Sequence, residues 1–421
     1  MLNRRTFGTL LAGAAAWGDA RAAGTTLPFY ASAGPELDLY ALDVGAASLA
    51  HRGSVTLPAN VQYAWPHPSL KYLYVIASNG QPGSGPMGAT GSDKNHYAIA
   101  YRIGPDGTLT QHGKPAVLPV RPLHASVDHE GAYLLIAYNR PSMVTVHRLR
   151  PDGSIGEEVK QTHNPDFGIY AHQVRATPLN KTVTLCSRGN DPTATKPEDP
   201  GHIEVFGFQD GQLSNLETIF PGNSGLGFGP RHLDFHPTAP FVYVSLEREN
   251  ALYVFGLKPD GTMTPQPLFK RSTLIDPDGK AKHPGQGAGP IHCHPNGKFV
   301  YQTNRGSGTI AGPDGKKVWN GGENSVVVWS IDQATGEPTR IQNAPAHGFE
   351  LRTFTMDPAG KVLIAASTTP MLVNEGGTLS TVSAGLSIFR IGDDGKLSFA
   401  RKADIDTAKG VQFWCGLLNM P

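Results

Sequence analysis

The chain has 421 residues, with 36 Lys plus Arg against 35 Asp plus Glu and a formal net charge of +1 at pH 7. This even balance argues against nucleic acid as a partner and against electrostatic attachment to anionic lipid. The 50 glycines and 35 prolines are typical of a chain that turns every few residues. No apolar run of about 20 residues follows the N-terminal segment, so no stable membrane anchor is expected.

The N-terminal segment, residues 1–23, has the pattern of an export signal. Arg4-Arg5 precedes Thr6-Phe7, an apolar stretch runs from Leu10 to Trp17, and Ala20-Arg21-Ala22 follows. A positive region, a short apolar region and an A-x-A site describe a cleaved signal that is too short to span a bilayer. The paired arginines resemble the twin-arginine signal that exports folded proteins. The segment therefore predicts a periplasmic or secreted protein, with a disordered N-terminal arm as the alternative.

One unit recurs along most of the remaining chain, and its clearest copy begins at Gly225. The run Gly-Leu-Gly-Phe-Gly-Pro-Arg-His-Leu-Asp-Phe-His-Pro (225–237) precedes two short segments rich in aromatic and β-branched residues, 241–247 and 251–257. Pro259-Asp260-Gly261 follows, and Asp-Gly suits a tight hairpin because glycine accepts a positive φ. With a last short segment ending near Phe269, the unit is predicted to form one small sheet of four antiparallel strands.

Variants of this unit recur with a period of about 50 to 60 residues, which indicates a propeller rather than a helical solenoid. Each shows a turn before an apolar strand: Trp65-Pro-His-Pro68, Val127-Asp-His129, Thr177-Pro178, His294-Pro295 and Asp357-Pro358. A seventh unit can be assembled from the two ends, since Pro28 to Leu57 lacks an innermost strand that residues 410–415 could supply. Residues 24–421 are therefore predicted to be all-β, a seven-bladed β-propeller of four-stranded antiparallel blades closed by its N- and C-terminal strands.

The cysteines and short motifs point to no cofactor. Cys186, Cys293 and Cys415 are too few and too dispersed for a disulfide framework, and each lies within a predicted strand, where a free cysteine is usually a small buried hydrophobe. The sequence contains no C-x-x-C, no H-E-x-x-H and no phosphate-binding G-x-x-x-x-G-K-[ST]. We therefore expect no zinc site, no nucleotide site and no cofactor.

Alignment of the repeats predicts which residues, distant in the sequence, lie close together in the fold. Aligned on the turn, the residue that ends the second strand of successive units is Ser78, Asn139, Arg188, Glu247, Arg305 or Thr368. In an antiparallel pair this end lies beside the start of the first strand, where Arg231 and His232 are found, with His172 in the preceding unit. We therefore predict that these charged and imidazole side chains share one end of the central channel.

Long loops point to the same end. Four Gly/Pro-rich segments connect second to third strands: residues 79–96, 189–201, 306–323 and 369–384. Because the third strand starts where the second ends, these loops must rim the charged end of the channel. Long loops on one rim of a rigid scaffold are where binding is usually built.

Structural roles are the alternative for each of these side chains. Three histidines of His-Pro turns are expected to cap turns on the opposite rim: His67, His236 and His294. Asp234 and His292 are expected to pack within blades. Glu247 and its arginines could form only a salt bridge between blades, and Arg188 could be a solvated loop residue.

The Gly-Phe-Gly-Pro-Arg-His-Leu-Asp-Phe-His-Pro run (227–237), the unit layout and the mature length resemble the lactonase family of seven-bladed propellers. That family includes the propeller-type 6-phosphogluconolactonases and the fungal 3-carboxy-cis,cis-muconate lactonizing enzyme. The resemblance covers roughly residues 28–415 and implies an active site of one His, two Arg and one Glu. These fall on His172, Arg231, Arg305 and Glu247. The pattern departs where Gly-Pro-Ile-His292 stands in place of Gly-Pro-Arg-His, which bears on the substrate more than on the reaction.

The residue types suit the opening of a lactone. The reaction needs a base to activate water and positive donors where the carbonyl oxygen becomes an oxyanion. Glu247 is expected to be the base, Arg231 and Arg305 the anion clamp, and His172 the proton donor to the leaving alkoxide. Arg188 and His232 are expected to contact the substrate. A metal is not expected, because a ring with arginines would repel a divalent cation.

These residues predict a lactonase acting on a sugar lactone or a related acidic lactone, with a small anionic or sugar lactone as the only partner. Run in reverse, the same set would close a lactone on a carboxymuconate. The third possibility is a non-catalytic secreted propeller that binds a partner or a carbohydrate through its rim loops.

Overall fold

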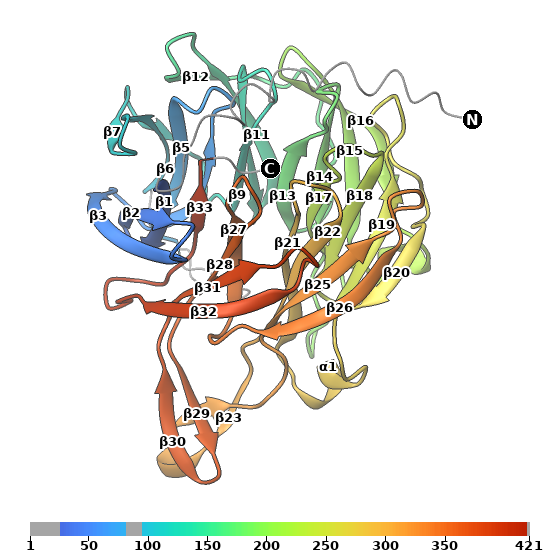
Figure 1. Cartoon of the computed structure of the whole chain (residues 1–421). Helices are drawn as coiled ribbons and strands as arrows, with labels where there is room; N and C mark the ends of the chain where they lie inside the picture. The colour runs from blue at the N-terminus through green and yellow to red at the C-terminus, as the bar shows by residue number, and fades with distance from the viewer. Residues whose placement is uncertain (1–25, 81–94, 419–421) are drawn as a thin grey trace.

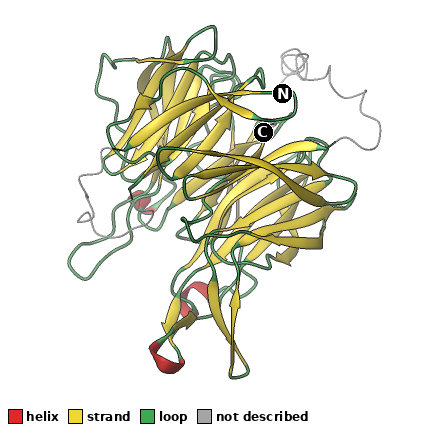
Figure 2. Cartoon of the chain, turned by 90° about the vertical axis from the view of Figure 1, so that its left-hand side faces the viewer, coloured by secondary structure: helices red, strands yellow, loops and turns green. Residues whose placement is uncertain are grey.

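A computed structural model describes residues 26–80 and 95–418. Seven four-stranded antiparallel sheets are arranged as the blades of a propeller (Figure 1), which confirms the predicted fold class. Strands dominate the architecture in both views, and the helical segments are single turns (Figure 2). The predicted export signal, residues 1–23, lies outside the described residues.

The first two blades illustrate the closure and the regular pattern. Blade 1 is built from both ends of the chain: β1 (Leu27–Ala33), β2 (Glu36–Asp43), β3 (Ser48–Thr56) and β33 (Cys415–Leu417). Blade 2 contains β4 (Val61–Pro66), β5 (Tyr72–Ser78), β6 (His96–Ile103) and β7 (Leu109–Gln111), with the short β8 (Ala116–Val117) also paired to β6.

The next three blades follow in chain order. Blade 3 contains β9 (His124–Val127), β10 (Tyr133–Asn139), β11 (Ser142–Leu149) and β12 (Ile155–Glu158). Blade 4 contains β13 (Ala171–Ala176), β14 (Thr182–Ser187), β15 (His202–Gln209) and β16 (Gln212–Ile219). Blade 5 contains β17 (Pro230–Phe235), β18 (Phe241–Leu246), β19 (Ala251–Gly256) and β20 (Phe269–Ser272). A 3₁₀ turn, η2 (Asn223–Gly225), precedes blade 5.

The last two blades carry insertions. Blade 6 contains β21 (Gln286–Cys293), β22 (Phe299–Gly306), β25 (Ser325–Ile331) and β26 (Pro338–Pro345). Blade 7 contains β27 (Leu351–Met356), β28 (Val362–Ser367), β31 (Gly385–Ile391) and β32 (Leu397–Asp404). The one-turn helix α1 (Gly279–Lys282) precedes blade 6.

Two of the Gly/Pro-rich rim loops contain hairpins. Between β22 and β25 the chain forms β23 (Thr309–Ala311), the 3₁₀ turn η3 (Pro313–Gly315) and β24 (Lys317–Trp319). Between β28 and β31 it forms β29 (Met371–Glu375) and β30 (Thr378–Val382). Both hairpins project from the same side of the propeller (Figure 1). The hairpin strands were missed because each is at most five residues long and the turns between them are glycine-rich.

The C-terminal strand closes the ring, as predicted. β33 pairs with β1 in the register Phe29–Leu417, Tyr30–Gly416 and Ala31–Cys415. Backbone hydrogen bonds extend this pairing, because the Ser32 amide donates to Trp414 and the Gly34 amide donates to Val411. The strand lies slightly later than residues 410–415. The inner edge of β1 is therefore covered, which removes a site for unwanted strand pairing.

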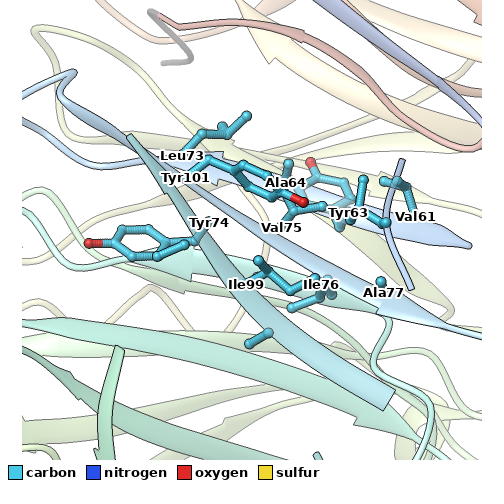
Figure 3. Packing of buried hydrophobic residues seen from close by; sticks show 14 of the residues in the cluster. Val61, Tyr63, Ala64, Leu73, Tyr74, Val75, Ile76, Ala77, Ile99 and Tyr101 are labelled. Carbon is cyan, nitrogen blue, oxygen red and sulfur yellow. The ribbon is translucent and has the colours of Figure 1, made fainter. Parts of the chain in front are cut away.

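The blades pack face to face, so their second strands are buried on both sides. In blade 2, β5 is buried from Leu73 to Ser78 and contacts apolar residues of β4 and β6, such as Tyr63 and Ile99 (Figure 3). This double burial explains why second strands appear in the sequence as continuous apolar runs rather than as alternating ones.

On the rim opposite the rim loops, a recurring histidine contact joins three of the blades to the blade that follows. In blade 5, His236 Nδ1 accepts the Ala239 amide at 2.9 Å and His236 Nε2 lies 2.9 Å from the Gly297 carbonyl of blade 6. His67 and His294 make the equivalent contacts to the carbonyls of Gly131 and Gly360. The structural role predicted for the three histidines is confirmed.

A second contact between blades, which we call the tyrosine latch, lies beside the histidine contact. The hydroxyl of Tyr243 donates to the Gly336 carbonyl of blade 6 at 3.3 Å. Tyr30, Tyr74 and Tyr301 bond the glycine carbonyl of the following blade in the same way. Gly336 has a φ of 77°, and a Cβ there would lie 2.7 Å from the Phe241 ring, so this turn requires glycine.

Candidate active site

A β-bulge at the start of four inner strands aims side chains into the channel end. The pairing of β13 with β14 skips from Ala171 to Gln173, and that of β17 with β18 skips from Pro230 to His232. The extra residues are His172 and Arg231. The pairings of β4 with β5 and of β27 with β28 skip one residue in the same way, and the extra residues there are Gln62 and Arg352. A bulged residue has no partner on the neighbouring strand, and its side chain is re-aimed as a result.

Glu247, directly after β18, lies at the centre of three arginines from adjacent blades. Its Oε1 is 3.0 Å from Arg188 Nε and 2.8 Å from Arg305 Nη2, and its Oε2 is 3.0 Å from Arg231 Nε. The structure thus brings together the four charged residues that the repeat alignment selected. Because these pairs span blades 4, 5 and 6, they also tie the blades together.

Arg231 differs from the other two arginines in its bonding. Its Nε lies 3.0 Å from Glu247 Oε2, whereas its buried Nη1 has no hydrogen-bond partner among the described residues. Buried donors of this kind are rare unless a ligand or water satisfies them. Arg231 therefore has N–H groups free to bind an anion.

A second carboxylate, Glu350, extends the charged cluster into blade 7. Its Oε1 lies 2.8 Å from Arg305 Nη1 and 2.7 Å from Arg352 Nη2, whereas its buried Oε2 has no partner in the described part of the chain. Glu350 has a φ of 56°, a region that non-glycine residues rarely adopt. We use the term arginine cluster for Arg188, Arg231, Glu247, Arg305, Glu350 and Arg352.

The loop 189–201 braces the outer side of the arginine cluster. Asp191 from this loop lies 2.6 Å from Arg188 Nη2 and 3.2 Å from Arg248 Nε, and Arg248 also bonds Glu198. Arg188 is therefore held between two carboxylates, Asp191 and Glu247. The alternative of a solvated loop residue does not fit this geometry, because its side chain is only 11% exposed.

Three histidines, His124, His172 and His232, form an imidazole layer next to the arginine cluster. The ring centroids of His172 and His232 are 5.0 Å apart, and those of His232 and His124 are 5.9 Å apart. The Nδ1 atoms of all three are buried and have no hydrogen-bond partner among the described residues. His124, at the same register position as His232 but in blade 3, was not found from the sequence.

Burial and the neighbouring guanidiniums set the protonation states. Burial raises the pKa of Glu247, but Arg188, Arg305 and Arg231 outweigh it and hold that pKa well below its usual value. Burial, reinforced by Arg231, lowers the pKa of His172 and of His232 well below the usual value of histidine. Near neutral pH the site therefore combines an ionised Glu247 with uncharged imidazoles.

Farther along the channel, Asp234 and His292 have a packing role. Asp234 Oδ1 lies 2.5 Å from Arg175 Nη1, and Asp234 Oδ2 accepts the Cys293 amide at 2.8 Å. His292 Nδ1 is 3.7 Å from Asp234. These contacts join blades 4, 5 and 6, as the structural alternative predicted.

The register corrects one sequence alignment. His292 pairs with Tyr301 as Asp234 pairs with Tyr243, so His292 is the counterpart of Asp234 and not of His232. Gly-Pro-Ile-His292 is therefore not a variant of Gly-Pro-Arg-His232. Each of the two inner strands has one extra residue at its bulge, but the Gly-Pro-Ile-His run lies two residues nearer to its His-Pro turn than the Gly-Pro-Arg-His run does.

Cavities elsewhere do not coincide with this chemistry. A cavity of about 860 Å³ lies on the opposite rim, between the turns at Leu70 and Pro105 and the start of β1. Its lining includes apolar residues such as Leu27 and Ile103 and the charged residues Arg52, Lys71 and Asp106, but no counterpart of the arginine cluster. In the described part of the chain, no group of three or more His, Cys, Asp or Glu side chains is placed to hold a metal ion, and no helix is long and apolar enough to cross a membrane.

Fold and site together define a seven-bladed propeller that carries arginines, carboxylates and imidazoles at one end of its channel. A family model described as "Lactonase, 7-bladed beta-propeller" matches residues 25–374. The chain therefore belongs to the lactonase family of seven-bladed β-propellers.

Solved structures support the same fold at low sequence identity. The periplasmic gluconolactonase of Pseudomonas aeruginosa is 21% identical, with a TM-score of 0.66 over 93% of this chain and 98% of that one. A "putative 6-phosphogluconolactonase" from Bacteroides uniformis is 17% identical, with a TM-score of 0.67 over 93% of this chain and 99% of that one. At these identities the likeness shows the shared fold.

Proposed function

We propose that the protein hydrolyses a sugar lactone or a related acidic lactone at the arginine cluster. The observation that carries this proposal is the pairing of Glu247 with three guanidiniums, one of which, Arg231, keeps buried N–H donors without partners. Such donors suit the oxyanion that forms when water adds to an ester carbonyl, because they are fixed in place before the charge develops. Membership of the lactonase family supports the same reaction class.

The protonation states favour roles for Glu247 and His172 that differ from those expected from the sequence. Glu247 is engaged by three guanidiniums that hold its pKa well below its usual value, whereas burial lowers the pKa of His172 but leaves its Nδ1 without a hydrogen-bond partner among the described residues. We therefore assign the base to His172 and the electrostatic support to Glu247. The Glu247 charge favours the protonated form of His172, which is the form that exists after water has been deprotonated.

The reaction proceeds in two steps. Water attacks the carbonyl carbon, His172 takes the proton, and the carbonyl oxygen becomes an oxyanion held by Arg231 and Arg305. The intermediate then collapses, the ring C–O bond breaks, and the leaving alkoxide takes the proton back from His172. The product is a hydroxy acid, and Arg188 and His232 are placed to contact its remaining hydroxyl or acidic groups.

A substrate screen tests the proposal. Purified protein is mixed with sugar lactones, 6-phosphogluconolactone and muconolactones, and acid release is followed against the uncatalysed rate. We expect at least one lactone to be hydrolysed, and an Arg305→Ala variant to be slower because it loses both binding and oxyanion stabilisation. Formation of a lactone from a carboxymuconate would instead assign the reverse reaction. No catalysis in either direction would leave a non-catalytic binding propeller.

Export completes the proposal. We infer that residues 1–23 direct the protein to the periplasm or beyond through the twin-arginine route. Replacement of Arg4 and Arg5 by lysine is expected to retain the uncleaved protein inside the cell. Unchanged export of that variant would rule out the route.

A further inference from the structure

Among the described residues, Arg121 is a charged side chain that forms no ion pair and lies beside the arginine cluster. It lies between β8 and β9, its Nε atom is buried, and that atom has no hydrogen-bond partner among the described residues. Burial, more than any neighbouring charge, lowers its pKa to about 10, so the guanidinium stays protonated at neutral pH. Burying an unpaired cation is costly unless something else compensates for it.

The Phe413 ring holds Arg121 close to a second guanidinium. Arg121 lies 5.8 Å and Arg352 lies 5.4 Å from the centroid of this ring, which precedes the closing strand β33. Arg352 disfavours the charged form of Arg121, so the two cations repel each other. One aromatic ring offsets part of this repulsion, and an anion bridging both guanidiniums would remove it.

Arg352 is joined to Glu247 by a chain of ion pairs. Arg352 binds Glu350, which binds Arg305, which binds Glu247. Arg121 shares the Phe413 ring with Arg352 and so lies next to this chain.

The two carboxylates of this chain, Glu247 and Glu350, already form ion pairs with arginines other than Arg121. Glu247 binds Arg188, Arg231 and Arg305, and Glu350 binds Arg305 and Arg352. Positive charge consequently accumulates on the side of Arg121. A guanidinium pair favours carboxylate or phosphate, which accept its planar array of donors.

We propose that Arg121 and Arg352, supported by Phe413, bind an acidic substituent of the lactone, either carboxylate or phosphate, remote from the ring carbonyl. This acid-group subsite rests on the proposed function, which places the carbonyl at Arg231 and Arg305. It makes the enzyme selective for lactones that carry a second anionic group over neutral sugar lactones.

Paired substrates test the selectivity. Gluconolactone, 6-phosphogluconolactone and a carboxylated muconolactone are compared as kcat/KM in the wild type and in Arg121→Gln. We expect the preference for an acidic lactone over the neutral one to fall about 10- to 100-fold, mainly through KM, since a charge-assisted hydrogen bond is lost. The acidic lactone that is most affected identifies the natural group. Arg121→Lys should retain part of the preference.

The matched control is Arg148→Gln, because Arg148 also lies over an aromatic ring, that of Tyr133 at 5.4 Å, but is itself exposed near the end of β11 in blade 3. It should leave the preference unchanged. An unchanged preference in Arg121→Gln would overturn the acid-group subsite while leaving the lactonase proposal intact.

A binding measurement separates failure of the subsite from failure of the function. Inorganic phosphate at constant ionic strength should raise the melting temperature of the wild type in a saturable way. Arg121→Gln should need about tenfold more phosphate for the same rise. Equal phosphate protection in the two proteins would overturn the subsite even if no lactone is turned over.

Discussion

At the scale of the residue, the site is defined by charges that hold one another in fixed states. Glu247 is ionised because three guanidiniums outweigh its burial, and His172 is uncharged because burial and Arg231 outweigh the attraction of Glu247. Burial alone would favour the neutral form of Glu247, so its charge depends on these guanidiniums. The protein thus keeps an uncharged imidazole and an ionised carboxylate close together at neutral pH.

The first prediction separates the two candidate bases by pH. In the wild type, kcat/KM should fall only well below pH 6.5, because His172 must be deprotonated and its pKa is lowered. Glu247→Gln should lower kcat about 100-fold by removing a preorganised charge. It should also move the acid limb to lower pH, since Glu247 raises the pKa of His172. Disappearance of the acid limb in Glu247→Gln would restore Glu247 as the base.

A stability prediction follows from the imidazole layer. Its histidines have folded-state pKa values below the ordinary value of 6.5, so the unfolded chain binds protons first as the pH falls. Stability should therefore be complete above pH 6.5 and decrease below it, by at most about 1.4 kcal/mol per pH unit for each histidine. Glu247 and Glu350 add to this loss only below about pH 4.5, where the unfolded carboxylates become protonated.

Urea unfolding between about pH 8 and pH 5, which extends roughly 1.5 units to either side of the ordinary histidine pKa, measures this dependence. His124→Phe is the informative variant, because the ring would keep its packing against Tyr63, whose centroid is 4.3 Å away, but would not titrate. It should be less sensitive to pH than the wild type. Identical pH profiles would show that His124 does not change its proton affinity on folding.

At the scale of the element, the same two devices recur in successive blades. A bulge at the start of the inner strand turns one side chain into the channel end, and a turn on the other rim receives a histidine or tyrosine from the preceding blade. The bulges therefore gather side chains at one end of the channel, and the histidine and tyrosine contacts join blades at the other end.

The latch can be tested by removing one hydroxyl group. Tyr243→Phe leaves the Gly336 carbonyl without its side-chain donor and should cost about 1 kcal/mol of stability. Tyr101→Phe is the control, because Tyr101 is also buried but its hydroxyl makes no hydrogen bond within the described chain. The comparison uses chemical denaturation at pH 8, above the titration of the histidines. Equal losses in both variants would show that the latch contributes no net stability.

The repeat explains what could be predicted from the sequence and what could not. The blades, the closure and the four residues around Glu247 follow from spacing, because residues at one repeat position occupy one place in every blade. Arg352 could have been found in the same way, since it precedes Pro358 by six positions as Arg231 precedes Pro237. Glu350 and Arg121 lie in connections between blades, where no repeat position exists, and only the folded chain brings them to the channel end.

At the scale of the whole molecule, a propeller has no single core, and its stability depends on an unbroken ring of blades. The three residues of β33 are the only strand that joins the two ends of the described chain. Trp414 is fully buried just before this strand, and its backbone and Ser32 exchange hydrogen bonds. Closure therefore affects both the stability of blade 1 and the position of Phe413 in the acid-group subsite.

A chain that ends at Gly410 tests this closure. It would leave the inner edge of β1 unpaired at Phe29, Tyr30 and Ala31, which β33 covers in the intact protein. Loss of Trp414 alone should cost about 3 to 5 kcal/mol, and the open edge should promote association between copies. A chain ending at Leu418 retains β33 and is the control. Urea unfolding and light scattering should show a less stable, self-associating protein only for the shorter chain. Equal stability and mass for both chains would mean that the ring is held closed by contacts between blades 1 and 7 without the C-terminal strand.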